Sequence, residues 1–151
     1  MEGVFKLKFN FSDEDLEDYF ISFSEDDQDE IEELEADTFF DFHTKEDHYN
    51  CIMITTKKDI DAYYDILQRN SVYCEITELS EDILNNRIDI EKEYRNYINS
   101  HNFMDWEFFI QGIRKWTLKE LDIDFVLDRI SSVGMENLTK VEKHFLKTYN
   151  E

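Results

Sequence analysis

The sequence contains no proline and only three glycines among its 151 residues. Average proteins contain roughly 5% proline and 7% glycine, so collagen-like repeats, proline-rich linkers and glycine-rich phosphate-binding loops are all excluded. The G-x-S-x-G, P-loop and G-x-G-x-x-G motifs do not occur either. Because no catalytic motif stands in the chain, we expect a protein that is not an enzyme.

Cysteine and long apolar runs are also scarce. Cys51 and Cys74 are the only cysteines, too few for a disulfide framework and not in a metal-binding spacing. Both lie in apolar segments, where we expect small buried side chains. The longest apolar run, residues 51–54, is far too short to span a membrane, and the first residues lack a signal-peptide pattern. We therefore expect a soluble cytoplasmic protein with reduced cysteines and without a cofactor.

Basic residues are outnumbered by acidic ones, and unevenly along the chain. Lysine and arginine total 16 against 37 aspartates and glutamates, a formal net charge of −21. Residues 1–82 hold 25 acids and 6 bases, a charge of −19, whereas residues 83–151 hold 12 acids and 10 bases, a charge of −2. Aromatic residues make up 15% of the chain, which argues against wholesale disorder. The asymmetry predicts two parts, an acidic one (1–82) and a nearly neutral one (83–151).

The acidic part has the pattern of an α+β fold. Alternating or continuous apolar residues predict strands at 4–11, 38–43, 49–56 and 72–79, and helical spacing predicts helices after Ser12 and at 59–68, with a short helical piece near 31–34. The order strand, helix, strand, strand, helix, strand is that of the ferredoxin-like βαββαβ fold. We expect the first and third strands at the centre of the sheet, the third being covered on both faces.

The nearly neutral part is predicted to be an all-helical extension that ends in a helical hairpin at 121–150. Gly134 stands where a left-handed glycine C-cap would end the first helix of the hairpin. Thr139 and Glu142 have the spacing of a capping box that would begin the second helix. The aromatic helix that begins at Phe103 is expected to lie between the open face of the sheet and this hairpin. A contact surface for a partner or a second copy is the alternative for that helix.

Residues 121–146 read LDIDFVLDRISSVGMENLTKVEKHFL. This segment resembles the short helical-hairpin tail of rhomboid-family intramembrane proteases of Bacteroidota-type bacteria, with the pattern L-D-x-I-S-x-x-G-x-x-S-L-T-x-x-E-K-x-F-L. The matching positions are Leu127, Asp128, Ile130, Ser131, Gly134, Leu138, Thr139, Glu142, Lys143, Phe145 and Leu146. Asn137 stands where the pattern has serine. The match covers none of the protease's catalytic or membrane parts, so it implies a hairpin and a bacterial source but no activity.

The most unusual feature is a run of acidic residues without any base between Ser12 and Asp37. Its fourteen members are Asp13, Glu14, Asp15, Glu17, Asp18, Glu25, Asp26, Asp27, Asp29, Glu30, Glu32, Glu33, Glu35 and Asp37. Like charges at this density repel one another, and a merely solvated helix gains stability from interspersed lysine. We therefore interpret the run as an electronegative surface that replaces nucleic-acid phosphate and docks on a basic protein. A solubilising surface is the alternative.

Other sites receive less support from the sequence. Four possible metal ligands cluster around the expected hairpin between the second and third strands: Asp41, His43, Asp47 and His48. We favour the interpretation that these are ordinary surface residues. Ferredoxin-like sheets can bind RNA on their open face through stacked aromatic residues, but the polar side of the first strand offers Lys6 and Lys8 instead. The 25 acids in this part would also repel phosphate.

These patterns together predict a non-enzymatic inhibitor or decoy from a bacterium or phage. Its partner would be a basic nuclease or other nucleic-acid-binding protein, as for immunity proteins and anti-CRISPR proteins. No nucleic acid, membrane or small molecule is expected to bind directly. The alternative function is a cytoplasmic adaptor or self-associating module that makes its contacts through the helical tail; a metal-dependent enzyme is a weaker third hypothesis.

Overall fold

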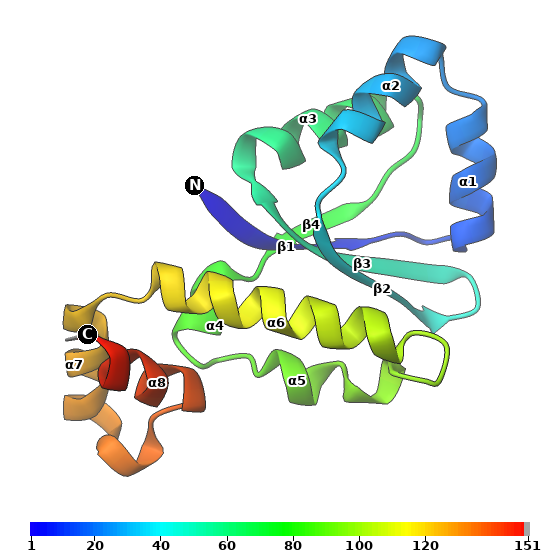
Figure 1. Ribbon diagram of the computed structural model, residues 1–151. Helices are drawn as coiled ribbons and strands as arrows, with labels where there is room; N and C mark the ends of the chain where they lie inside the picture. Colours follow the sequence, from blue (N-terminus) through cyan, green and yellow to red (C-terminus); the bar gives the residue numbers. More distant parts are fainter. Residues whose placement is uncertain (150–151) are drawn as a thin grey trace.

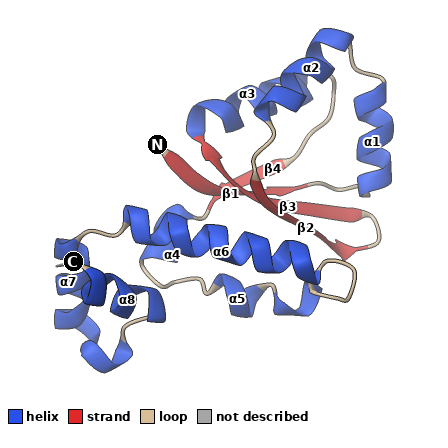
Figure 2. Cartoon of the chain, in the orientation of Figure 1, coloured by secondary structure: helices blue, strands red, loops and turns tan. Residues whose placement is uncertain are grey.

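In the computed structural model, residues 1–149 are described, and they form a mixed α/β fold around a four-stranded antiparallel sheet (Figure 1 and Figure 2). The strands are β1 (Glu2–Lys8), β2 (Thr38–Lys45), β3 (His48–Thr56) and β4 (Glu75–Glu78). Their order across the sheet is β2-β3-β1-β4. The first and third strands are therefore central, as the sequence predicts, and apolar side chains cover β3 on both faces.

One face of the sheet is covered by α1 (Asp13–Ile21), α2 (Glu25–Leu34) and α3 (Lys57–Arg69). Each helix starts at a serine or threonine whose side-chain oxygen accepts a hydrogen bond from a backbone N–H of the first turn, the arrangement that these residues favour at N-caps. Ser12 is such a cap, at 3.2 Å from the N–H of Asp15. Phe5, Leu7 and Phe9 bury their rings and methyl groups beneath these helices.

The opposite face is covered by α6 (Phe103–Glu120), which buries Trp106, Phe109 and Ile113 against strand residues. Gly112 allows the close approach, because a Cβ atom there would lie 2.4 Å from Cγ2 of Thr38. The indole Nε1 of Trp116 donates to the backbone oxygen of Glu2 at 3.0 Å. Helix α6 thus completes the core of the sheet, as well as touching the C-terminal hairpin.

Two short helices, α4 (Ser80–Leu84) and α5 (Ile90–Glu93), connect the sheet to α6. The predicted division after residue 82 falls inside α4. Leu79, Ile83 and Ile90 belong to the same buried cluster as α6 and the sheet. Residues from both parts of the chain therefore share one core.

The chain ends in a helical hairpin of α7 (Ile123–Val133) and α8 (Lys140–Thr148), around a small core of Leu121, Val126 and Leu138. The predicted capping box is confirmed, since the Thr139 and Glu142 side chains each accept the backbone N–H of the other residue. Gly134 has φ 82° and ψ 156°. The positive φ explains the glycine, whereas the ψ value differs from the left-handed C-cap that the sequence suggests.

Several element boundaries differ from the sequence prediction. The last strand is limited to Glu75–Glu78, because the N–H of Val72 bonds to the carbonyl of Leu67 and is lost to the sheet. The acidic segment forms the full helix α2 instead of a short piece near 31–34. Ser24 caps this helix, and three acids in its first turn interact favourably with the positive N-terminal end of the helix dipole. Among residues 1–149, no helix is both long and apolar enough to cross a membrane.

Candidate protein-binding surface

The fourteen acids lie on α1, on α2 and in the segment that follows α2. Thirteen have exposed side chains, and Asp27 alone among them is half-buried. Figure 2 shows the two helices on the side of the sheet opposite α6 and the C-terminal hairpin. The predicted residues are therefore gathered on one side of the molecule, and we call these fourteen residues the acidic surface.

Few of these carboxylates lie beside a basic side chain. Arg69 pairs with both Asp27 and Glu30, and Nε2 of the His43 imidazole lies 3.1 Å from Asp13. The other eleven make no ion pair with any residue in 1–149. Their mutual repulsion is thus left almost uncompensated in the folded chain.

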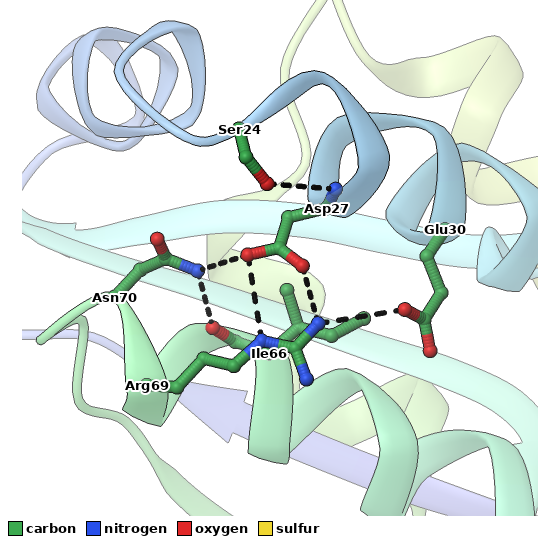
Figure 3. A network of polar contacts seen from close by, with 6 residues as sticks. All are labelled: Ser24, Asp27, Glu30, Ile66, Arg69 and Asn70. Carbon is green, nitrogen blue, oxygen red and sulfur yellow. Dashed lines mark hydrogen bonds and ion pairs between the residues drawn. The ribbon is translucent and has the colours of Figure 1, made fainter.

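Asp27 differs from the rest because it fastens α2 to α3 (Figure 3). Its carboxylate accepts hydrogen bonds from the Arg69 guanidinium and, at 3.0 Å, from Nδ2 of Asn70. The same amide also donates to the backbone oxygen of Ile66 at 2.8 Å. The hydrogen bond from Arg69 is the main reason why the pKa of Asp27 lies below its ordinary value. Asp27 therefore fixes α2 against α3, while the other carboxylates of α2, apart from Glu30, make no ion pair with any residue in 1–149.

The residues proposed as metal ligands are directed to separate partners. Asp41 accepts a hydrogen bond from the Tyr49 hydroxyl at 2.8 Å, and His43 lies against Asp13. Asp47 and His48 contact each other at 2.8 Å. Within residues 1–149, no three histidine, cysteine or carboxylate side chains are grouped so that they could hold a metal ion.

Neither cysteine is placed as an activated nucleophile. Burial raises the pKa of the Cys51 thiol, and it raises that of Cys74 to about 12. Both are free thiols and stay protonated near neutral pH, where the thiolate is the reactive form.

The polar side of β1 is covered rather than open. The Lys6 ammonium lies 5.6 Å from the centre of the Tyr94 ring, a cation–π distance. Because α6 packs on this same face, the sheet surface considered for RNA is occupied by the protein's own helix.

A small cavity beside the C-terminal end of α2 was not predicted. Its volume is about 160 Å³, and it is lined by residues of α2, β2, β3 and α3. Glu35 is the one lining residue that belongs to the acidic surface; Phe39, Tyr63 and Asp59 were not singled out. Successive side chains of a strand point to opposite faces, so the odd-numbered residues of 49–55 are expected on one face of β3. No local pattern predicts that Phe39 of β2 and Tyr63 of α3 line the cavity beside them.

A second feature is an apolar group at the start of α6, the helix for which the sequence leaves a contact surface open as the alternative role. Phe103, Met104 and Phe108 have exposed fractions of 50%, 76% and 62%. These side chains point away from the core that Trp106 and Phe109 join. Exposed apolar side chains that lie together are typical of contact surfaces.

Comparison with models of protein families, with curated proteins and with solved structures gives no match for this chain. The similarity of residues 121–146 to rhomboid tails stays a prediction. The case for a function therefore depends on the acidic surface, the cavity and the exposed group of α6.

Proposed function

We propose that the protein is a non-enzymatic inhibitor or decoy that uses the acidic surface to bind a basic nuclease or other nucleic-acid-binding protein in the cytoplasm. The observation that carries this proposal is the set of eleven exposed carboxylates without an ion pair on one side of the molecule. A cationic partner would offset their repulsion, and its approach would be accelerated by long-range attraction.

The attachment of α2 also supports a binding role. The helix is fixed to α3 by Asp27, Arg69 and Asn70, so its outer carboxylates are presented on a defined scaffold. Preorganised groups lose less conformational entropy when a partner binds.

We also infer that the sheet and its first three helices are a variant of the ferredoxin-like fold. The order β2-β3-β1-β4 with antiparallel neighbours supports this assignment. An extra helix, α2, precedes β2, and α6 covers the face that the basic βαββαβ unit leaves open.

The experiment is affinity capture from a nuclease-treated bacterial lysate with three forms of the protein. The first is the wild type. The test variant replaces five outer carboxylates of α2 by amides and keeps Asp27 and Glu30: Glu25→Gln, Asp26→Asn, Asp29→Asn, Glu32→Gln and Glu33→Gln. The matched control removes five exposed charges elsewhere: Glu75→Gln, Glu81→Gln, Glu93→Gln, Glu107→Gln and Glu136→Gln.

We expect the wild type and the control to retain basic nucleic-acid-binding proteins that added double-stranded DNA displaces. The test variant should lose them. Retention of the same proteins by both variants would contradict the proposal, because binding would then not depend on the acidic surface.

The exposed group of α6 favours the second candidate, an adaptor or self-associating module. Phe103, Met104 and Phe108 would then be buried in a contact with a partner or a second copy. Sedimentation of the wild type and of Phe108→Ser across a concentration range separates these functions. A dimer that the substitution abolishes would support the second candidate.

A further inference from the structure

We propose that the cavity beside the C-terminal end of α2 receives one lysine or arginine side chain of the basic partner. This inference rests on the proposed function, since it names a contact made by the same partner. The cavity volume of about 160 Å³ is several times the roughly 30 Å³ that a water molecule occupies. It is also well below the roughly 300–1,000 Å³ of pockets that hold drug-sized ligands. Its size therefore suits a single side chain.

Aromatic residues from three different elements line the cavity: Phe39 of β2, Tyr49 of β3 and Tyr63 of α3. The Tyr49 hydroxyl donates to Asp41, which fixes the direction of the ring. Phe39 is 49% exposed, so its ring is accessible to a side chain of the partner. The faces of aromatic rings carry negative potential and attract ammonium and guanidinium groups.

The acidic side chains at the cavity match this preference. Glu35 and Asp59 are lining residues, and Glu35 is exposed. Glu35 also follows directly after α2, whose last turn contains no basic residue. The C-terminal end of a helix carries partial negative charge on its unpaired carbonyl groups. The carboxylates and the end of α2 thus both favour a positive charge beside these aromatic rings.

Apolar side chains supply the remaining lining, among them Leu34, Met53 and Ile60. Lysine and arginine bury their methylene stems along such surfaces and leave the charged group at a polar edge. A hydrated metal ion would gain nothing from this apolar part. The combination of an apolar interior and acidic residues therefore favours a basic side chain.

The first test uses n-butylguanidinium and n-butylammonium as probes and n-butanol as the uncharged control. Binding is followed by methyl NMR at Ala36, Met53 and Ile60. We expect saturable shifts with both cations and none with butanol. Glu35→Gln should weaken cation binding roughly two- to fivefold, as for one exposed charge pair, while Glu33→Gln, which removes the same charge outside the cavity, should not. Equal shifts with butanol, or none with the cations, would overturn the inference.

The second test uses the captured partner and separates this inference from the proposed function. Phe39→Leu and Glu35→Gln should raise the dissociation constant of the partner without lowering the melting temperature. Glu35→Gln should raise it more than Glu33→Gln, which removes the same charge from the acidic surface outside the cavity. If the five-carboxylate variant loses the partner but the two cavity variants bind it normally, the proposed function stands and the cavity inference is wrong. If no variant changes binding, both are wrong.

Discussion

At Gly112, α6 approaches the sheet closely over Thr38 of β2. In a helix, alanine is favoured over glycine by about 1 kcal/mol, so a free helix would gain from Gly112→Ala. Here the new Cβ would stand 2.4 Å from Cγ2 of Thr38. We predict that Gly112→Ala lowers the free energy of unfolding by about 1–3 kcal/mol, the usual effect of overpacking, as measured by urea titration.

The double variant Gly112→Ala with Thr38→Ala checks the cause. Removing Cγ2 of Thr38 should relieve the contact. The double variant should therefore lose less unfolding free energy than the two single variants lose in sum. Strict additivity would show that the steric explanation is wrong.

Asp27 gives a pH-dependent prediction at the same scale. Its pKa in the folded chain is lowered from the ordinary 3.8, first by the hydrogen bond from Arg69 and then by that from Asn70. The stabilisation is therefore fully present above that ordinary value and is lost as pH falls through the lower, folded pKa. We predict that Asp27→Asn destabilises the chain at pH 7 and that its difference from wild type shrinks below about pH 4.

Urea unfolding at pH 7 and pH 3 measures this difference. Asp29→Asn is the control, because Asp29 is exposed, lies beyond the first turn of α2 and has no ion pair among residues 1–149; it should stay within about 0.5 kcal/mol of wild type at pH 7. A deficit for Asp27→Asn that is as large at pH 3 as at pH 7 would refute the role given to its charge.

At the scale of elements, Glu142 joins the C-terminal hairpin to the rest of the chain. Its carboxylate is 2% exposed and accepts hydrogen bonds from Asn86 at 3.1 Å, from Arg129 at 3.4 Å and from the N–H of Thr139 at 3.0 Å. Hydrogen bonds to charged groups contribute roughly 1.5–3 kcal/mol. We predict that Glu142→Ala lowers the free energy of unfolding by about that amount, measured by urea titration.

Glu136→Ala is the matched control, because Glu136 lies in the same hairpin with an exposed side chain. It should change stability by less than about 0.5 kcal/mol. Equal effects of the two substitutions would mean that the hydrogen bonds of the Glu142 carboxylate do not stabilise the fold.

Elements that depend on neighbours in sequence could be predicted, and contacts between distant residues could not. The Ser12 cap and the capping box of Thr139 each join residues three positions apart, so local spacing suffices. The bonds of Asp27 with Arg69 and of Trp116 with Glu2 span 42 and 114 positions. Nothing in one segment indicates such a partner, so the structural role of Asp27 could not be predicted.

The candidate site shows the same division. The charge count alone predicts the acidic surface, because exposed positions for so many carboxylates follow from the cost of burying charge. The cavity depends on how β2, β3 and α3 bring Phe39, Tyr49 and Tyr63 together. That arrangement is set by strand pairing and helix packing over long distances, which one sequence does not encode locally.

At the scale of the whole molecule, a net charge of −21 should destabilise the fold at low ionic strength. The screening length falls from about 30 Å at 0.01 M salt to about 8 Å at 0.15 M. We therefore predict that the melting temperature rises as sodium chloride is increased over this range. The rise should be smaller for the variant with five α2 amides, because fewer carboxylates repel each other. A melting temperature that falls with salt would contradict this account of the acidic surface.

The most direct test of the central claim is the association rate constant with the captured partner, measured by stopped flow at about 0.05 M and 0.5 M salt. The three forms are the wild type, the variant with five α2 amides and the matched control. We predict a steep fall with salt for the wild type and the control, and a slower, less salt-dependent association for the α2 variant. A wild-type rate constant that is the same at both salt concentrations, or identical rate constants for the two variants, would contradict binding through the acidic surface.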